Sequence, residues 1–189
     1  LSETTENVID QLDDVMFIKV YLDGDDLPSD YLKLQRKVRE SLNHFRRLNP
    51  NIEYEFINLF DEKDDKTRNE IYQQLWEKGL NPATLREKNQ ESYREQMIFP
   101  GAIVTYKGVE YPVNFLEDDA GVDRLSQIHK SISRIEQNFV QAMLFLTNPE
   151  TKKIAFIEGH GELDEYQTAD IMYSLSEFYE IERLSIDSK

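Results

Sequence analysis

A five-residue loop at positions 158–162, with the sequence Glu-Gly-His-Gly-Glu, is the part of the chain whose residue types are best suited to chemistry. The imidazole of His160 titrates near neutral pH, and with a carboxylate on each side it could act as a general base or as a metal ligand. The two glycines would let the backbone approach a ligand closely. The helix expected next could receive an anion at its N-terminus. The candidate ligand-binding residues are therefore Glu158, Gly159, His160, Gly161 and Glu162.

The same loop can be a simple turn, in which the glycines satisfy backbone geometry and His160 caps the helix or pairs with a carboxylate. Its pattern matches neither the Gly-rich dinucleotide motif nor the Walker loop, so no nucleotide is indicated. Neither a Ser-His-Asp order nor a pair of catalytic carboxylates can be identified. We therefore expect no catalytic residue, no cofactor and no metal ion, and an enzyme that uses the loop is the alternative hypothesis.

Two strands and a helix would hold this loop. Ile154–Ile157 is an apolar run typical of a strand that is covered on both faces. Residues 164–179 have helical spacing, with Ile171, Leu175 and Phe178 directed inward, and residues 181–186 form a second strand. In such a βαβ unit, ligands lie beyond the carboxyl ends of the strands, where the loop falls.

This unit is too small to cover its own sheet, because one helix covers one face and two strands leave both edges unpaired. A second copy of the chain would supply the cover, and we expect a homodimer with residues 154–157 or 181–186 near the contact. The alternatives are intramolecular docking on Phe139, Met143 and Leu146, and cover by the remainder of a domain that this sequence only begins.

The region before the loop is organised around a hairpin. Residues 102–106 and 109–115 alternate with a period of two around Lys107-Gly108, which predicts two antiparallel strands. Further strands are expected at 15–22 (covered on both faces), 52–59 and 83–88, a turn at 88–95, and helices at 2–12, 30–48, 66–78 and 122–147. We predict an α/β fold, with one mixed-sheet domain at 1–149 and the start of a second, truncated α/β domain at 150–189.

The β-α-β-α-hairpin-α layout resembles the thioredoxin-like fold, in which a proline begins the strand of the terminal hairpin. The comparison suggests a cis bond between Phe99 and Pro100. The chain has no cysteine, so the redox chemistry of thioredoxins and any disulfide are excluded.

Charge limits the partners. The chain has 37 acidic and 22 basic residues and a net charge of -15, which argues against nucleic acid and against an anionic membrane surface. One helix differs from the rest, because one side of residues 30–48 is basic. This side is either a solvated face or a docking patch for an acidic partner. Its residues are Lys33, Arg36, Lys37, Arg39, Arg46 and Arg47.

Three segments together resemble the gliding-motility-associated ABC transporter auxiliary family (GldG-like proteins). They are Leu1–Leu22, Ile98–Leu116 and Lys152–Glu165, in this order along the chain. The resemblance implies a non-catalytic auxiliary or binding subunit that works with ABC permease and ATPase subunits in gliding motility or the linked secretion machinery. It also implies a location on the periplasmic side of the inner membrane, anchored by membrane helices that lie outside this sequence. A purely structural envelope scaffold is a further alternative.

Overall fold

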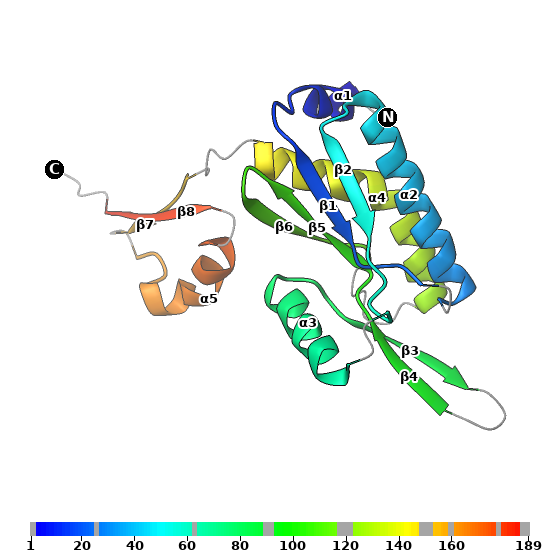
Figure 1. Ribbon diagram of the computed structural model, residues 1–189. Coiled ribbons are helices and arrows are strands. Elements are labelled where there is room, and N and C mark those ends of the chain that lie inside the picture. The colour runs from blue at the N-terminus through cyan, green and yellow to red at the C-terminus, as the bar shows by residue number, and fades with distance from the viewer. Residues whose placement is uncertain are drawn as a thin grey trace. The chain divides into compact units, whose positions relative to one another are not determined.

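The chain divides into two compact units, Leu1–Asn148 (unit 1) and Pro149–Lys189 (unit 2). The computed structural model describes residues 3–24, 27–61, 64–88, 93–116, 123–147, 153–158, 161–176 and 179–185. Figure 1 shows the helices and strands of both units. The predicted α/β class is confirmed, since unit 1 carries a mixed sheet and unit 2 a β-α-β segment.

Unit 1 contains a four-stranded mixed sheet and a separate two-stranded ribbon. Its elements are α1 (Glu3–Asp10), β1 (Met16–Val20), α2 (Ser29–Leu48), β2 (Ile52–Phe56), α3 (Asp65–Glu77), β3 (Ala83–Lys88), β4 (Tyr93–Ile98), β5 (Gly101–Tyr106), β6 (Val109–Asn114) and α4 (Arg124–Thr147). The sheet order is β2-β1-β5-β6, with β1 parallel to β2 and antiparallel to β5, and β5 antiparallel to β6. The ribbon pairs β3 with β4.

The main core lies between one face of the sheet and the helices α1, α2 and α4. Successive strand residues point to opposite faces, so Met16, Ile18 and Val20 of β1 are fully buried there. The helices add apolar side chains at helical spacing, and α2 packs beside α4 (Figure 1). At the centre, the ring of Phe139 lies 6.2 Å from that of Phe45 and 5.8 Å from that of Phe115.

The opposite face of the sheet has a smaller core, which α3 helps to build. Its buried members are Leu59, Leu75, Leu80, Phe99 and Ile103. The N-terminus of α3 is fixed by Asp64, whose side chain accepts a hydrogen bond of 2.8 Å from the backbone N–H of Thr67. The expectation that the first strand is covered on both faces was wrong, because Val15 is exposed and Phe17 and Lys19 are only half-buried.

The hairpin of β5 and β6 is confirmed in register, with Tyr106 opposite Val109. Lys107 and Gly108 both have positive φ angles, 48° and 83°, as the two-residue turn of such hairpins requires. The bond between Phe99 and Pro100 is trans, which removes one support for the thioredoxin-like comparison. Of the polar stretch expected to be a turn, residues 93–95 belong to β4, where pairing with β3 satisfies their backbone groups, and residues 89–92 lie outside the described residues.

Unit 2 consists of β7 (Lys153–Glu158), α5 (Glu165–Ser176) and β8 (Glu180–Ser185), with β7 parallel to β8. Within one chain only one face of its first strand is covered, and cover of the other face by a second copy stays a prediction. Ile154 and Phe156 are half-buried, whereas Ala155 and Ile157 on the other face are exposed. Ile171 was expected to point inward and is 54% exposed. Leu175, also expected to point inward, is half-buried, and Phe178 lies outside the described residues. Thr168 is buried and Met172 is half-buried, and neither was predicted.

The three side chains named for the docking alternative have partners within unit 1. Phe139 and Met143 are fully buried and Leu146 is 7% exposed, and all three belong to the main core of unit 1.

Candidate functional site

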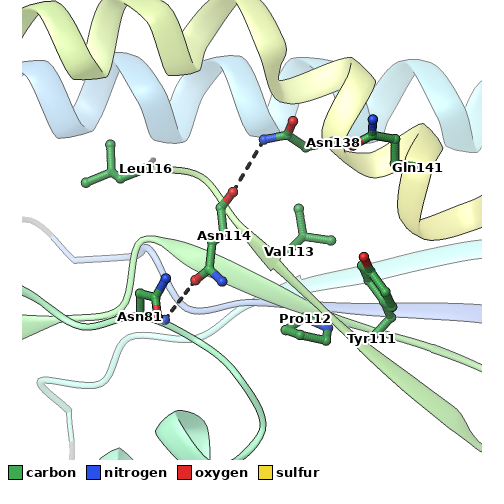
Figure 2. A pocket seen from close by; sticks show the side chains of 8 residues that line it. All are labelled: Asn81, Tyr111, Pro112, Val113, Asn114, Leu116, Asn138 and Gln141. Atoms are coloured by element: carbon green, nitrogen blue, oxygen red, sulfur yellow. Dashed lines mark hydrogen bonds between the residues drawn. The ribbon is translucent and has the colours of Figure 1, made fainter. Parts of the chain in front are cut away.

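A cavity of about 380 Å³ lies at the outer edge of the unit 1 sheet. It is bounded by the edge strand β6, by α4 and by the segment that follows α3, as Figure 2 shows. Polar side chains of one chemical type, the carboxamide, come from all three directions. The lining residues are Asn81, Tyr111, Pro112, Val113, Asn114, Leu116, Asn138 and Gln141.

The end of α3 places Asn81. Leu80 donates its N–H to the carbonyl of Leu75 at 3.0 Å, and Gly79 donates to that of Trp76 at 2.9 Å. This pair of bonds is a Schellman motif, which needs a left-handed residue, and Gly79 has φ 89°. Leu80 is then fully buried in the smaller core, so Asn81 emerges at the edge of β6.

Asn114 locks this segment to the end of β6. Its side-chain oxygen accepts a hydrogen bond of 2.8 Å from the backbone N–H of Asn81 (Figure 2). Its side-chain amide donates to the carbonyl of Gly79 at 2.9 Å. Its own backbone carbonyl accepts a hydrogen bond of 3.3 Å from the side chain of Asn138. Asn114 is therefore mainly a positioning residue, since both ends of its side chain are already used.

The helix α4 closes the cavity from above. Asn138 is half-buried and Gln141, one turn further along, is exposed. The ring of Tyr111 packs against that of Phe145 of the same helix, with centroids 4.8 Å apart. One wall is therefore aromatic and the others carry amides that both donate and accept hydrogen bonds.

The cavity carries no carboxylate, imidazole or amine in its lining. The side chains of Lys78 and Glu110, which lie in the turn after α3 and on β6, pair with each other at 2.5 Å. An uncharged site of this kind suits recognition of a neutral polar ligand. The part of the chain that the structure describes also contains no group of three or more His, Asp or Glu residues that could hold a metal.

The loop predicted from the sequence belongs to unit 2. Gly159 and His160 lie outside the described residues. Gly161 has φ 94° and no described atom near the place of a Cβ, and Glu162 is exposed. Glu158 ends β7 and pairs with the guanidinium of Arg183.

Arg183, which sequence reasoning missed, joins the three elements of unit 2. It contacts Glu158 of β7, donates to the hydroxyl of Thr168 of α5 and lies 3.1 Å from the sulfur of Met172. Its side chain is only 18% exposed. In the sequence it is one charged residue in the run Glu-Arg-Leu, and nothing there shows that it faces the helix and not solvent.

The N-terminus of α5 already has its own acidic cap. The carboxylate of Asp164 accepts a hydrogen bond of 2.8 Å from the N–H of Gln167, whose side chain accepts one of 3.1 Å from the N–H of Asp164. This reciprocal capping box satisfies the backbone donors that would otherwise receive an anion. Of the loop carboxylates, that of Glu158 is engaged within unit 2, by Arg183.

Fold and site together define a mixed α/β protein with an uncharged polar cavity at the edge of its sheet. Residues 1–105 match the family described as a domain of unknown function (DUF7088), and the chain belongs to that family. The match runs from the N-terminal residues into β5. No curated protein and no solved structure matches the chain. Among the described residues, no helix is both long and apolar enough to cross a membrane.

Proposed function

We propose that the chain is a non-catalytic binding subunit, and that it serves as the auxiliary component of a membrane ABC transporter complex linked to bacterial gliding motility or secretion. The observation that carries the binding role is the cavity of Figure 2, whose polar lining is made of amides. The transporter role is supported by the resemblance of the three sequence segments and is a proposal at that level.

The ligand class follows from the chemistry of the walls. Carboxamides both donate and accept hydrogen bonds, as the hydroxyl groups of sugars do. The exposed side of an aromatic ring such as Tyr111 packs against apolar faces of a ligand. A charged ligand would lose its hydration without gaining an opposite charge. The proposed ligand is therefore a neutral sugar or a similarly polar, uncharged small molecule.

A titration of the chain with a panel of neutral mono- and disaccharides tests this assignment. We expect chemical-shift changes at Asn81, Tyr111 and Gln141, and a raised unfolding midpoint, since a ligand of the native state stabilises it. Gln141→Ala should weaken binding, whereas Gln137→Ala, at an exposed position of the same helix outside the cavity lining, should not. Shifts that spread over the surface without saturation would contradict a ligand site here.

The transporter role is tested in the native bacterium with the full-length protein. Purification from solubilised membranes should yield an ABC permease and an ATPase in constant ratio with the protein. Protease added to intact spheroplasts should degrade these residues, because the proposal places them on the periplasmic side of the inner membrane. Protection from protease, or recovery without either transporter subunit, would favour the envelope-scaffold alternative.

The enzyme alternative is a glycan- or small-molecule-processing enzyme that uses the loop Gly159-His160-Gly161-Glu162. In the sequence this loop follows the carboxyl end of β7, and ligands of βαβ units lie beyond such strand ends. If this alternative holds, His160→Ala abolishes turnover of a small-molecule or glycan substrate while folding is kept. Turnover that persists in His160→Ala would remove the loop from catalysis.

Self-association of the chain is part of the same proposal. Ile157 and Leu184 are opposite each other in the β7–β8 register, and each is 48% exposed. A second copy that covers this face would remove apolar surface from water. Light scattering over a concentration series should show a rising mass, which Ile157→Lys should suppress. A constant monomer mass would contradict the dimer.

A further inference from the structure

The two edges of the unit 1 sheet differ in how they are protected. On the β6 edge, Pro112 lacks an N–H group, and the side chain of Asn138 donates to the outward carbonyl of Asn114. On the β2 edge there is no proline. No other described strand pairs with the outer side of β2. An unprotected edge of this kind is a template for an added strand.

The hydrogen-bond pattern shows which groups that edge presents. Met16 donates its N–H to the carbonyl of Asn51 at 2.9 Å, and Ile57 donates to that of Val20 at 2.8 Å. In a parallel pair, residues alternate between facing the neighbour and facing away. Residues 51, 53, 55 and 57 therefore face β1, and the N–H and C=O groups of Tyr54 and Phe56 face outward.

Two arginines of α2 lie over the rings of the same two residues. The guanidinium of Arg39 is 3.7 Å from the ring centroid of Phe56, and that of Arg46 is 4.9 Å from that of Tyr54. Asn43 lies between them on the helix and accepts a hydrogen bond of 2.7 Å from the hydroxyl of Tyr54. Positions seven apart are about two helical turns apart, so both arginines lie on one side of α2. Stacking on the rings holds the two guanidinium groups in place before any partner binds.

The surface formed by Arg39 and Arg46 is positive, whereas the chain as a whole has a net charge of -15. Arg47 adds a third positive group, and Glu40 lies in the same surface hollow as Arg46 and Arg47. Asp23 is 3.9 Å from Arg39, at the limit of an ion pair between partly exposed groups. Carboxylates of a partner would therefore be attracted to two fixed points, near Arg39 and near Arg46.

We propose that the β2 edge binds an extended acidic segment of a partner protein as an added strand. The main chain of the segment pairs with the outward N–H and C=O groups of Tyr54 and Phe56, which supplies affinity without sequence preference. Its alternate side chains, on the α2 side of the sheet, are carboxylates that pair with Arg39 and Arg46. This site lies at the opposite edge of the sheet from the sugar cavity and does not depend on it.

The probe is a fluorescein-labelled, blocked peptide of alternating valine and glutamate, titrated against the whole chain and followed by anisotropy. One control peptide has glutamine in place of glutamate, and a second is N-methylated at alternate residues so that it cannot pair as a strand. Arg39→Glu and Arg46→Glu are compared with Lys66→Glu, which makes the same charge change on exposed α3.

We expect saturable binding that each arginine variant weakens about tenfold or more and that Lys66→Glu leaves within about twofold. Both control peptides should bind at least about tenfold more weakly than the probe. Hydrogen exchange should slow at the amides of Tyr54 and Phe56 when the probe binds. Equal binding of the N-methylated peptide, or no saturable binding of the probe, would overturn the proposal. Protection of these two amides without peptide, rising with protein concentration, would overturn it in favour of a second copy of the chain.

Discussion

Unit 1 and unit 2 begin from similar strands and reach different degrees of burial. In unit 1, β1 has three fully buried side chains, because helices and neighbouring strands cover one whole face of its sheet. In unit 2, β7 is as apolar, yet among its described residues none is buried. Thr168 is the one buried side chain among the described residues of unit 2. Apolar composition therefore indicates a strand whose side chains are stabilised by burial. The number of neighbouring helices and strands decides whether the same chain buries them.

The largest expected difference concerns the core that only unit 1 has. Phe139→Ala should lower the free energy of unfolding of unit 1 by about 3–5 kcal/mol, because it removes a fully buried ring between two others. Phe145→Ala is the control on the same helix, at a site 40% exposed, and should cost about 1 kcal/mol or less. Urea unfolding followed by the amide signals of 3–147 measures both. Equal costs would mean that the helix faces are assigned wrongly.

Much of unit 1 could be predicted because its signals are local. The apolar positions of α2 recur at helical spacing, and the hairpin carries its turn residues, Lys107-Gly108, in the sequence. β4 was missed because its residues are mostly polar, and a strand of that composition is stabilised by pairing with β3 and not by its own pattern. Local patterns thus predicted the helices and strands well, but they predicted poorly which faces of these elements are buried.

The cavity could not be predicted, because its walls come from separate elements. Asn81, Asn114 and Asn138 meet only when α3, β6 and α4 pack together, and asparagine is common in loops for other reasons. The predicted loop was found by the opposite route, from adjacent residues of promising type. Glu158 of that loop turned out to pair with Arg183, a residue that no local pattern connects with it.

A smaller difference in stability is expected when one glycine of each unit is replaced by alanine. A Cβ at Gly101 would lie 2.7 Å from a methyl group of Leu80 and 2.9 Å from the carbonyl oxygen of Val113. Gly101→Ala should therefore destabilise unit 1 by about 1–3 kcal/mol through overpacking. Gly161→Ala in unit 2 meets no described atom and should cost about 1 kcal/mol, from its positive φ alone. Hydrogen exchange of each unit measures the two costs, and a larger cost at Gly161 would contradict the comparison.

The role of Arg183 tests how unit 2 holds together without a buried core. Arg183→Lys keeps the charge but loses the planar fork that contacts Glu158 and Thr168 at once. We expect a loss of about 1 kcal/mol in the stability of unit 2, seen as faster amide exchange in α5. Lys153→Arg, at the exposed end of the same pair of strands, is the control and should change exchange little. Unchanged exchange in Arg183→Lys would show that the contacts of Arg183 do not stabilise the unit.

The smallest effects come from one exposed charge cluster in each unit, and they have opposite signs with pH. In unit 1, hydrogen bonds from Lys107 and then from Tyr106 hold the pKa of Asp13 below its usual value of 3.8. A carboxyl group with a lowered pKa stabilises the fold above the usual value, and this contribution is lost as the pH falls through the lowered pKa. In unit 2, hydrogen bonds to Glu182 and Glu180 raise the pKa of Lys153 to about 12. An amine with a raised pKa stabilises the fold fully below its usual value of 10.5, and this contribution is lost as the pH rises through about 12.

Carbon-13 titration of the two side chains separates these contributions. Lys107→Met should raise the midpoint of Asp13 toward its usual value and leave that of Lys153 unchanged, while Glu182→Gln should lower the midpoint of Lys153 alone. Because both groups are fully exposed, added salt should weaken both shifts. If Lys107→Met left the titration midpoint of Asp13 unchanged, the contact between the segment before β1 and the β5–β6 turn would not be formed in solution. Protonation of Asp13 in acid would then lower the stability of unit 1 no more than protonation of any unpaired carboxylate does. The two units would no longer differ in the direction in which pH changes their stability.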